Sequence, residues 1–287
     1  MYERKNFVPK QKLKAEDMNR IEDALCQFSN PNLLINSDFR NPVNQRGKTS
    51  YTGVSSALLY TIDRWGIVNV PTVTVQEGCI KVENPSSATY TGRFKQVFEN
   101  ALPNDTYTLS VMVKSNTSDV TIGNFGKINA GFKGLYSHTS ATDISFNEVV
   151  FYIYSNASIE IEWIKLERGN ISTPLIPRHY VEELLLCQRH YYEFDGRVIM
   201  SEYTDSNADG VINFPVPMYS VPAATFERYD YYVNSLGTIS ASAVEVNQNY
   251  KSNKYALIKY TKNSKDTFTI GKSINGILKV KFDAEIY

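Results

Sequence analysis

Trp163-Ile164-Lys165-Leu166-Glu167-Arg168-Gly169, near the middle of the chain, begins the stretch from which the fold can be inferred. It follows an alternating apolar run and reads as a strand with one buried face. Next comes Thr173-Pro174-Leu175-Ile176-Pro177-Arg178, whose prolines favour an extended connector. Glu182-Glu183-Leu184-Leu185-Leu186-Cys187-Gln188-Arg189-His190-Tyr191-Tyr192 follows and is rich in helix formers. We therefore expect one β-rich module to end here and a short helix to lead into a second.

The region before this junction, residues 31–178, is predicted to be a β-sandwich or jelly roll. Its runs are β-branched or apolar at alternate positions, and turn residues such as Asn84-Pro85 separate them. Many short strands without helices between them are typical of two packed sheets. The expected strands are residues 73–76, 78–82, 93–98, 107–113, 148–154 and 159–166.

The region after the junction, residues 179–287, is predicted to be a linker helix followed by a compact β-sandwich. Residues 180–192 have one largely apolar side, formed by Leu184, Gln188 and Tyr191 with Leu185 and Cys187. The expected strands are residues 197–200, 211–214, 225–229, 254–260, 267–270 and 278–284. The fold class is thus mostly β, with few helices.

The N-terminal segment, residues 1–30, is predicted to contain a helix over residues 10–28. Met18, Ile21, Leu25 and Phe28 have the 3-4-3 spacing of a coiled-coil seam. Two heptads are too short to assemble alone, so this stripe packs either on its own domain or around a symmetry axis or partner. Pro31 stops the helix.

Composition narrows the possible functions. A length of 287 residues suggests two modest domains, and equal numbers of basic and acidic residues, 30 each, disfavour sequence-independent nucleic-acid binding. The three cysteines lack the spacing of a metal site, so we expect each of them to be a small buried apolar residue: Cys26, Cys79 and Cys187. No apolar run approaches the roughly 18 residues of a membrane span. The N-terminus lacks the apolar part of a signal peptide, which predicts synthesis in the cytoplasm without one.

The two tryptophans have two possible roles. Asp63-Arg64-Trp65 could present an indole face to a sugar ring, but a tryptophan within a strand more often belongs to the core. Trp163 continues the alternation of Ile159 and Ile161, which predicts a core position.

Residues 205–210 begin like a calcium-binding loop, with Asp205, Asn207 and Asp209 followed by Gly210. A complete EF-hand loop would have a carboxylate at its twelfth position, where this chain has Val216. A hairpin turn using Asp-Gly explains the segment as well. No cofactor is therefore expected, and a structural calcium ion elsewhere in the chain is the alternative.

Tyrosine is abundant, with 20 residues in the chain, and suits recognition surfaces because its ring is rigid and has a polar tip. The candidate glycan-binding residues of the C-terminal module are Tyr203, Tyr229, Tyr231, Tyr232 and Tyr250, with Trp65 as a candidate in the preceding module. Tyr229, Tyr231 and Tyr232 cannot all face one side of a strand, so some should be exposed. The alternative is that half of these tyrosines belong to the core.

No catalytic signature of a hydrolase, metalloprotease, kinase or dinucleotide-binding enzyme occurs in the chain. The histidines His138, His179 and His190 have no recognisable triad context. We therefore expect a protein that is not an enzyme. A glycosidase needs only two suitably spaced carboxylates, so a polysaccharide-degrading enzyme stays an alternative, although β-helix repeats are missing.

Three stretches together resemble tail fibre and receptor-binding proteins of bacteriophages and prophages. The first is residues 12–22, the second combines residues 32–39, 44–47 and 60–65, and the third combines residues 187–192 with residues 214–225. The pattern differs at two positions: such proteins have Arg in place of Tyr219 and usually Tyr in place of His190.

The resemblance implies a homotrimeric virion tail component whose jelly roll is similar to carbohydrate-binding modules. Its partners would be a bacterial surface glycan and tail or baseplate proteins, with no nucleic acid and no membrane insertion. The hypothesis is non-catalytic host attachment, with the C-terminal module as the distal tip. The alternatives are a tail enzyme that degrades polysaccharide and a purely structural tail connector.

Overall fold

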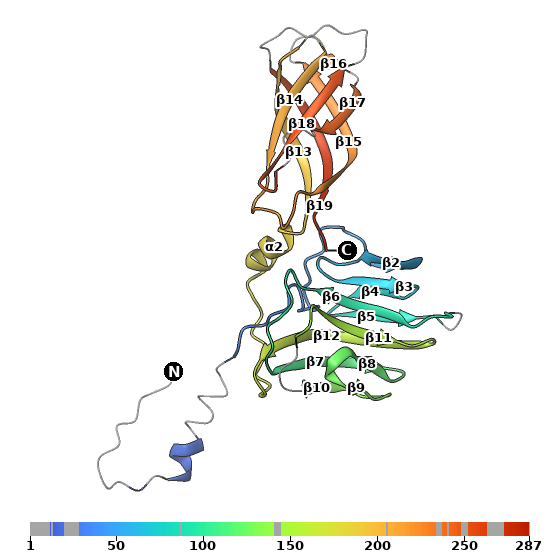
Figure 1. The fold of residues 1–287 in the computed structure, drawn as a ribbon, viewed down its shortest axis with the longest axis vertical. Coiled ribbons are helices and arrows are strands. Elements are labelled where there is room, and N and C mark those ends of the chain that lie inside the picture. Colours follow the sequence, from blue (N-terminus) through green and yellow to red (C-terminus); the bar gives the residue numbers. More distant parts are fainter. Residues whose placement is uncertain are drawn as a thin grey trace.

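The computed structural model describes residues 12, 14–19, 29–85, 88–140, 145–204, 206–233, 237–239, 241–247, 252–262 and 273–286. The chain is mostly β with few helices, which confirms the predicted fold class. Two β modules lie one above the other, and helix α2 (Tyr180–Gln188) lies between them (Figure 1). Near the N-terminus, residues 15–19 are helical, and residues 20–28 of the predicted seam lie outside the described part.

The first module is an antiparallel sandwich of two sheets. Sheet A has the order β1-β4-β5-β12-β7-β10 and sheet B the order β2-β3-β6-β11-β8-β9. The strands of sheet A are β1 (Ser50–Thr52), β4 (Thr72–Gln76), β5 (Cys79–Asn84), β12 (Ala157–Arg168), β7 (Tyr107–Asn116) and β10 (Gly134–Thr139). Those of sheet B are β2 (Ser55–Tyr60), β3 (Gly66–Asn69), β6 (Gly92–Val97), β11 (Glu148–Ile153), β8 (Val120–Ile122) and β9 (Lys127–Ile128), with the 3-10 turn η1 (Gly123–Phe125) between β8 and β9.

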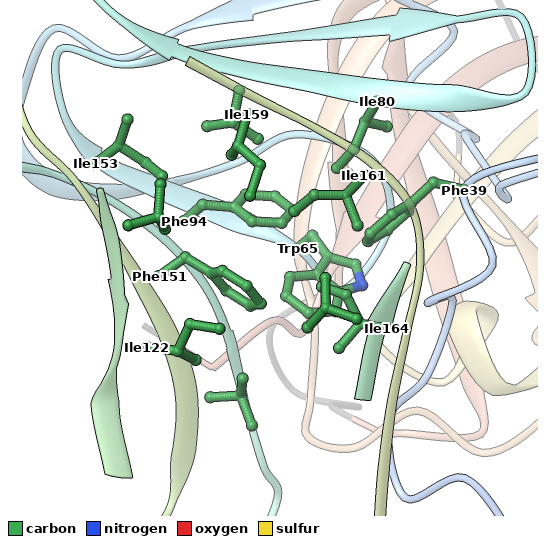
Figure 2. Close-up of a cluster of buried hydrophobic side chains, with 14 of the residues drawn as sticks. Phe39, Trp65, Ile80, Phe94, Ile122, Phe151, Ile153, Ile159, Ile161 and Ile164 are labelled. Carbon is green, nitrogen blue, oxygen red and sulfur yellow. The ribbon is translucent and has the colours of Figure 1, made fainter. Parts of the chain in front are cut away.

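The core of this sandwich lies between the two sheets and is centred on aromatic rings (Figure 2). Trp65 stacks on Phe94 with ring centroids 4.7 Å apart, and Phe39 meets the indole edge-on at 5.4 Å. Such pairs add to the stabilisation that comes from burying their apolar area. Isoleucines from β5, β8, β11 and β12 surround the rings, as alternating strands require.

The C-terminal module is one antiparallel sheet with the order β16-β15-β19-β13-β14-β18-β17. The sheet curls around its own core, so that its two halves act as the layers of a sandwich and β15 approaches β17 (Figure 1). Val198, Met200, Ile258, Val280 and Phe282 are among the enclosed side chains. The strands are β13 (Tyr191–Glu202), β14 (Asn207–Asn213), β15 (Ala223–Val233), β16 (Gly237–Ile239), β17 (Ala241–Val246), β18 (Tyr255–Lys262) and β19 (Ser273–Asp283).

The linker helix is shorter than predicted. Helix α2 ends at Gln188, and Tyr191 and Tyr192 already belong to β13, where they pair with Asp283 and Phe282 of β19. Aromatic residues favour strands, and a neighbouring strand is available here, so pairing replaces the last predicted turn of the helix. Within the described residues, no helix has the length and apolar character that crossing a membrane requires.

Candidate functional site

A pocket of about 330 Å³ opens on the outer face of sheet A, the face away from the sandwich core. It is lined by Arg40, Leu135, Trp163, Ser172, Thr173, Pro174 and Leu175. The lining therefore combines an indole, three aliphatic side chains or rings, two hydroxyls and one guanidinium. Pockets that bind small ligands have this composition: mostly apolar walls and a few polar groups that fix orientation.

Trp163 reaches this pocket because β12 carries a β-bulge. Ile161 pairs with Val113 of β7, but Trp163 pairs with the next residue of β7, Met112. Glu162 is the extra residue, and it shifts the alternation by one position. Ile161 and Ile164 therefore face the core, whereas Trp163 is buried at 8% exposure on the opposite face. The predicted core position of Trp163 is corrected: the side chain is buried, but outside the sandwich core.

The far wall of the pocket is the connector, which two buried charges fasten to sheet A. The Lys165 ammonium donates to Thr173 Oγ1 at 2.5 Å and to the Pro174 carbonyl at 3.0 Å. Glu167 accepts from the backbone N–H of Thr173 at 2.9 Å. Lys165 and Glu167 are also paired with each other at 3.2 Å, both with about 1% or less of the side chain exposed. Burial lowers the pKa of Lys165, and Glu167 opposes that shift.

Arg40 forms the charged corner of the pocket. Its Nε and Nη2 donate to the two carboxylate oxygens of Asp38, at 2.7 and 2.8 Å. Asp38 itself lies beside β12, where its backbone bridges to Trp163. The Asp38 carboxylate therefore fixes the Arg40 guanidinium, which lines the pocket together with Trp163.

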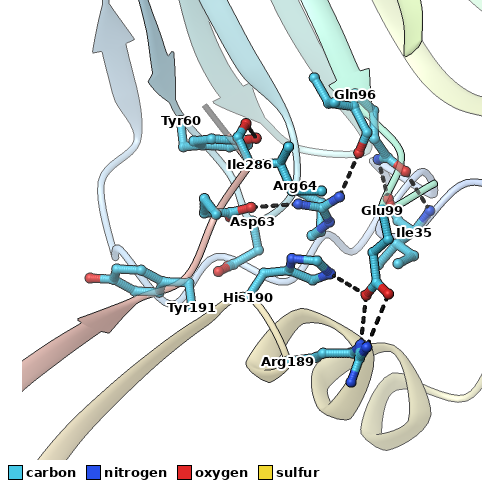
Figure 3. Close-up of polar contacts among 12 residues, drawn as sticks. Ile35, Tyr60, Asp63, Arg64, Gln96, Glu99, Arg189, His190, Tyr191 and Ile286 are labelled. Atoms are coloured by element: carbon cyan, nitrogen blue, oxygen red, sulfur yellow. Dashed lines mark hydrogen bonds and ion pairs between the residues drawn. The ribbon is translucent and has the colours of Figure 1, made fainter. Parts of the chain in front are cut away.

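A second polar region joins the two modules (Figure 3), and the side chains of Asp63, Arg64 and Glu285 in it are buried. Glu285, after β19, accepts from Arg64 Nη1 at 2.5 Å and lies 3.4 Å from Arg46 Nη2. Arg46 also contacts Asp63 at 3.3 Å and covers the ring of Tyr191 at 3.9 Å. Burial raises the pKa of Asp63 to about 6, and Arg46 opposes this shift.

The turn at residues 61–65 explains how two neighbouring residues reach different regions, Arg64 the polar region between the modules and Trp65 the core of the sandwich. Arg64 has a φ of 69°, a left-handed conformation that is uncommon for a residue with a side chain. The turn is closed by the Thr61 N–H donating to the Trp65 carbonyl at 2.8 Å. It directs Arg64 toward Glu285 and Trp65 into the core.

The helix end contributes a second set of contacts to the module interface. Arg189 Nε and Nη2 donate to Glu99 at 2.6 and 3.0 Å, and His190 Nε2 lies 3.0 Å from the same carboxylate (Figure 3). The His190 ring stacks on Tyr219 with centroids 5.5 Å apart. The two positions that depart from the tail-protein pattern are thus in contact with each other. Burial and nearby Arg64 lower the pKa of His190 to about 3.

Trp65, a candidate sugar platform, is fully buried in the sandwich core. Its indole N–H donates to the Asn36 carbonyl at 2.9 Å. Both its face and its polar edge are used inside the protein, so the role as a glycan-binding residue is corrected to a core role.

The candidate tyrosines are placed only in part. Tyr203 is 44% exposed at the end of the β13–β14 hairpin. Tyr229, Tyr231 and Tyr232 lie on β15, where their backbones pair with Leu278, Gly276 and Asn275 of β19. Tyr250 lies outside the described residues. The proposed tyrosine surface therefore stays a prediction.

The calcium-loop candidate is part of a hairpin. Asp205 lies outside the described residues, and the turn closes where the Tyr203 N–H donates to the Asn207 carbonyl at 3.1 Å. Asp209 and Gly210 are inside β14, so the expected Asp-Gly turn is corrected to a turn that precedes them. A Cβ at Gly210 would lie 2.7 Å from Met200 and Val198 atoms, which explains the glycine. Among the described residues, no three His, Cys, Asp or Glu side chains form a group that could hold a metal ion.

Two of the three cysteines are described, and Cys79 and Cys187 are free thiols with no exposed surface, as expected of small buried residues. Cys26 lies outside the described part. Burial raises the pKa of the Cys187 thiol well above its usual range, which keeps it neutral and unreactive.

Comparison with known proteins identifies no family. No protein-family model and no curated protein matches the chain. Among solved structures, wild-type discoidin II from Dictyostelium discoideum is similar at 10% identity and a TM-score of 0.21, covering 67% of this chain and 77% of that chain. Native recombinant discoidin II of the same organism is similar at 10% identity and a TM-score of 0.20, covering 67% and 78%. Likeness at these TM-scores carries no argument about function.

Proposed function

We propose that this chain is a tail component of a phage or phage-derived particle that attaches to a bacterial surface glycan without cleaving it. The ordered resemblance of three separate stretches to tail proteins supports the setting. The pocket at Trp163 supports the binding, since aromatic and aliphatic walls beside a few polar groups suit a sugar ring. This pocket is the single observation that carries the proposed glycan binding.

The test is binding of the full chain to purified cell-wall polysaccharides of candidate hosts, measured by isothermal titration. Leu135→Glu places a charge on a side chain that is 50% exposed at the pocket, so it should fold normally and weaken binding at least about tenfold. Trp163→Phe is a second variant that keeps an aromatic ring but reduces its area. Tyr154→Ala, an exposed aromatic on a residue just after β11 of the other sheet, is the matched control and should bind like the parent.

Unchanged binding by both pocket variants, with binding by the parent intact, would move the site away from this pocket. The C-terminal tyrosines would then be the next candidates.

In the proposed homotrimer, three weak binding sites would act together and bind with higher avidity than one site alone. Exposed apolar side chains around α2 support an interface between copies: Val181 is 55% exposed and Leu185 39% exposed, one turn apart. Mass measurement in solution at micromolar concentration should give three times 32.6 kDa. A monomer would contradict this part of the proposal.

Whether the glycan is cleaved distinguishes non-catalytic attachment from enzymatic degradation. A tail enzyme would release new reducing ends during long incubation, and the proposal expects none. A purely structural connector would bind no glycan at all, and its exposed apolar residues around α2 would instead contact neighbouring tail proteins.

A further inference from the structure

The hydroxyl groups of the Trp163 pocket are already engaged within the protein. Ser172 Oγ shares a hydrogen bond of 2.8 Å with Ser110 Oγ of β7. Thr173 Oγ1 donates to Glu167 and accepts from the Lys165 ammonium. These groups fasten the connector, so they contribute little to ligand choice.

Arg40 is a charged side chain of the pocket that has more donors than its partner Asp38 uses. A guanidinium carries five N–H groups, and Asp38 accepts from its Nε and Nη2. Among the described residues, none other than Asp38 accepts from the Arg40 guanidinium, which leaves two protons on Nη1 and one on Nη2. The pocket therefore offers a ligand a directed donor, and its natural complement is an acceptor such as a carbonyl oxygen.

The charges around Arg40 disfavour a negatively charged ligand. Asp38 and Glu162 both act on the guanidinium, and both favour its charged form. One positive charge thus faces two negative charges, and the nearby pair of Lys165 and Glu167 sums to zero. A carboxylate or phosphate entering the pocket would be repelled by Asp38 and Glu162 as well as attracted by Arg40.

The remaining walls are apolar. Leu135 is half exposed and Leu175 and Pro174 belong to the connector, while the Trp163 indole forms another wall. A ligand that fits should combine a neutral hydrogen-bond acceptor with a small apolar group next to it.

We propose that the pocket recognises the acetamido group of an N-acetylhexosamine in the glycan. The acetamido carbonyl accepts from Arg40, its methyl group packs on the aliphatic wall, and the sugar ring lies against Trp163. This inference rests on the proposed glycan attachment and names the sugar class that the site selects.

The test compares two oligosaccharides with the same β-1,4-linked backbone, tetra-N-acetylchitotetraose and cellotetraose, by titration against the full chain. The first carries acetamido groups where the second has hydroxyls. We expect tetra-N-acetylchitotetraose to bind at least about tenfold more tightly, the effect of one hydrogen bond to a charged group with its apolar contact. Arg40→Gln should remove most of this preference and leave the binding of cellotetraose unchanged.

Arg197→Gln, which changes an exposed arginine of β13 in the other module, is the matched control and should keep the preference. Circular dichroism verifies that the Arg40 variant is folded. Equal binding of the two oligosaccharides, or tighter binding of an oligogalacturonate, would overturn this inference while leaving glycan attachment in place. If neither these sugars nor any host polysaccharide binds, the proposed function itself fails.

Discussion

His190 and Asp63 are buried at the module interface with pKa values displaced in opposite directions. The pKa of His190 is lowered to about 3, and that of Asp63 is raised to about 6. As pH falls below about 6.5, the unfolded chain protonates His190 but the folded chain does not, so His190 lowers the free energy of unfolding. From pH 6 down to about 4, folded Asp63 holds a proton that the unfolded chain lacks. Asp63 therefore raises the free energy of unfolding as the pH falls through this range.

We therefore predict that variants of these two residues change the pH dependence of stability with opposite signs. As the pH falls from 6 to 4, His190 should decrease the free energy of unfolding of the parent by up to about 1.4 kcal/mol per pH unit, and His190→Gln should remove this decrease. Over the same range Asp63 should increase the free energy of unfolding by a similar amount, and Asp63→Asn should remove this increase. Chemical denaturation of the parent and both variants at several pH values checks this. Parallel pH profiles for all three proteins would contradict it.

Trp65 gives a prediction that separates a core role from a binding role. Trp65→Ala should lower the free energy of unfolding by about 3–5 kcal/mol, because it leaves a cavity among Phe39 and Phe94. Trp65→Phe should cost less and should leave glycan affinity unchanged. Thermal melts and the titration described above measure the two effects, and a folded Trp65→Phe protein that no longer binds would restore Trp65 as a site residue.

At the scale of elements, β12 and the connector depend on the pair of Lys165 and Glu167. Lys165→Met should lower the free energy of unfolding by about 3–5 kcal/mol, since it leaves Glu167 buried without its cation. It should also release the connector, which limited proteolysis near residues 170–178 would detect. The double variant Lys165→Met with Glu167→Leu should recover part of the stability, and no recovery would show that the hydrogen bonds to Thr173 matter more than the charge balance.

Sequence patterns located β4, β5, β6, β7, β11 and β12 of the first module but missed β1, β2, β3, β8, β9 and β10. The predicted strand over residues 267–270 lies outside the described residues. The alternation that located β7, β11 and β12 is a local property, so it can be read from a single strand. The bulge at Glu162 interrupts that alternation without any change in residue type, so the outward position of Trp163 was not visible. The pair of Arg64 and Glu285 joins residues 221 positions apart, and no local pattern encodes it.

At the scale of the whole molecule, Glu285 is one of the buried residues that join the two modules. Glu285→Gln removes the charge that Arg64 and Arg46 share, and we expect both modules to stay folded but to sample more relative orientations. Small-angle X-ray scattering should show a broader distribution of distances, with circular dichroism unchanged. Glu193→Gln, which changes a residue paired with Lys279 within the C-terminal sheet, is the matched control. A scattering curve identical to that of the parent would contradict the prediction.

The C-terminal module is held at both of its chain ends, since β13 begins at Tyr191 and β19 ends at its pairing partner Asp283. On one side His190 contacts Glu99, and on the other Tyr60 donates to the Ile286 carbonyl at 2.5 Å. A force that pulls the C-terminal module away from the first module therefore acts on two strands, β13 and β19. Both strands are loaded at the same edge of the sheet, so the hydrogen bonds between them are not sheared, and the contacts of Glu99 and Tyr60 must break before the modules move apart. The joint is built to carry tension.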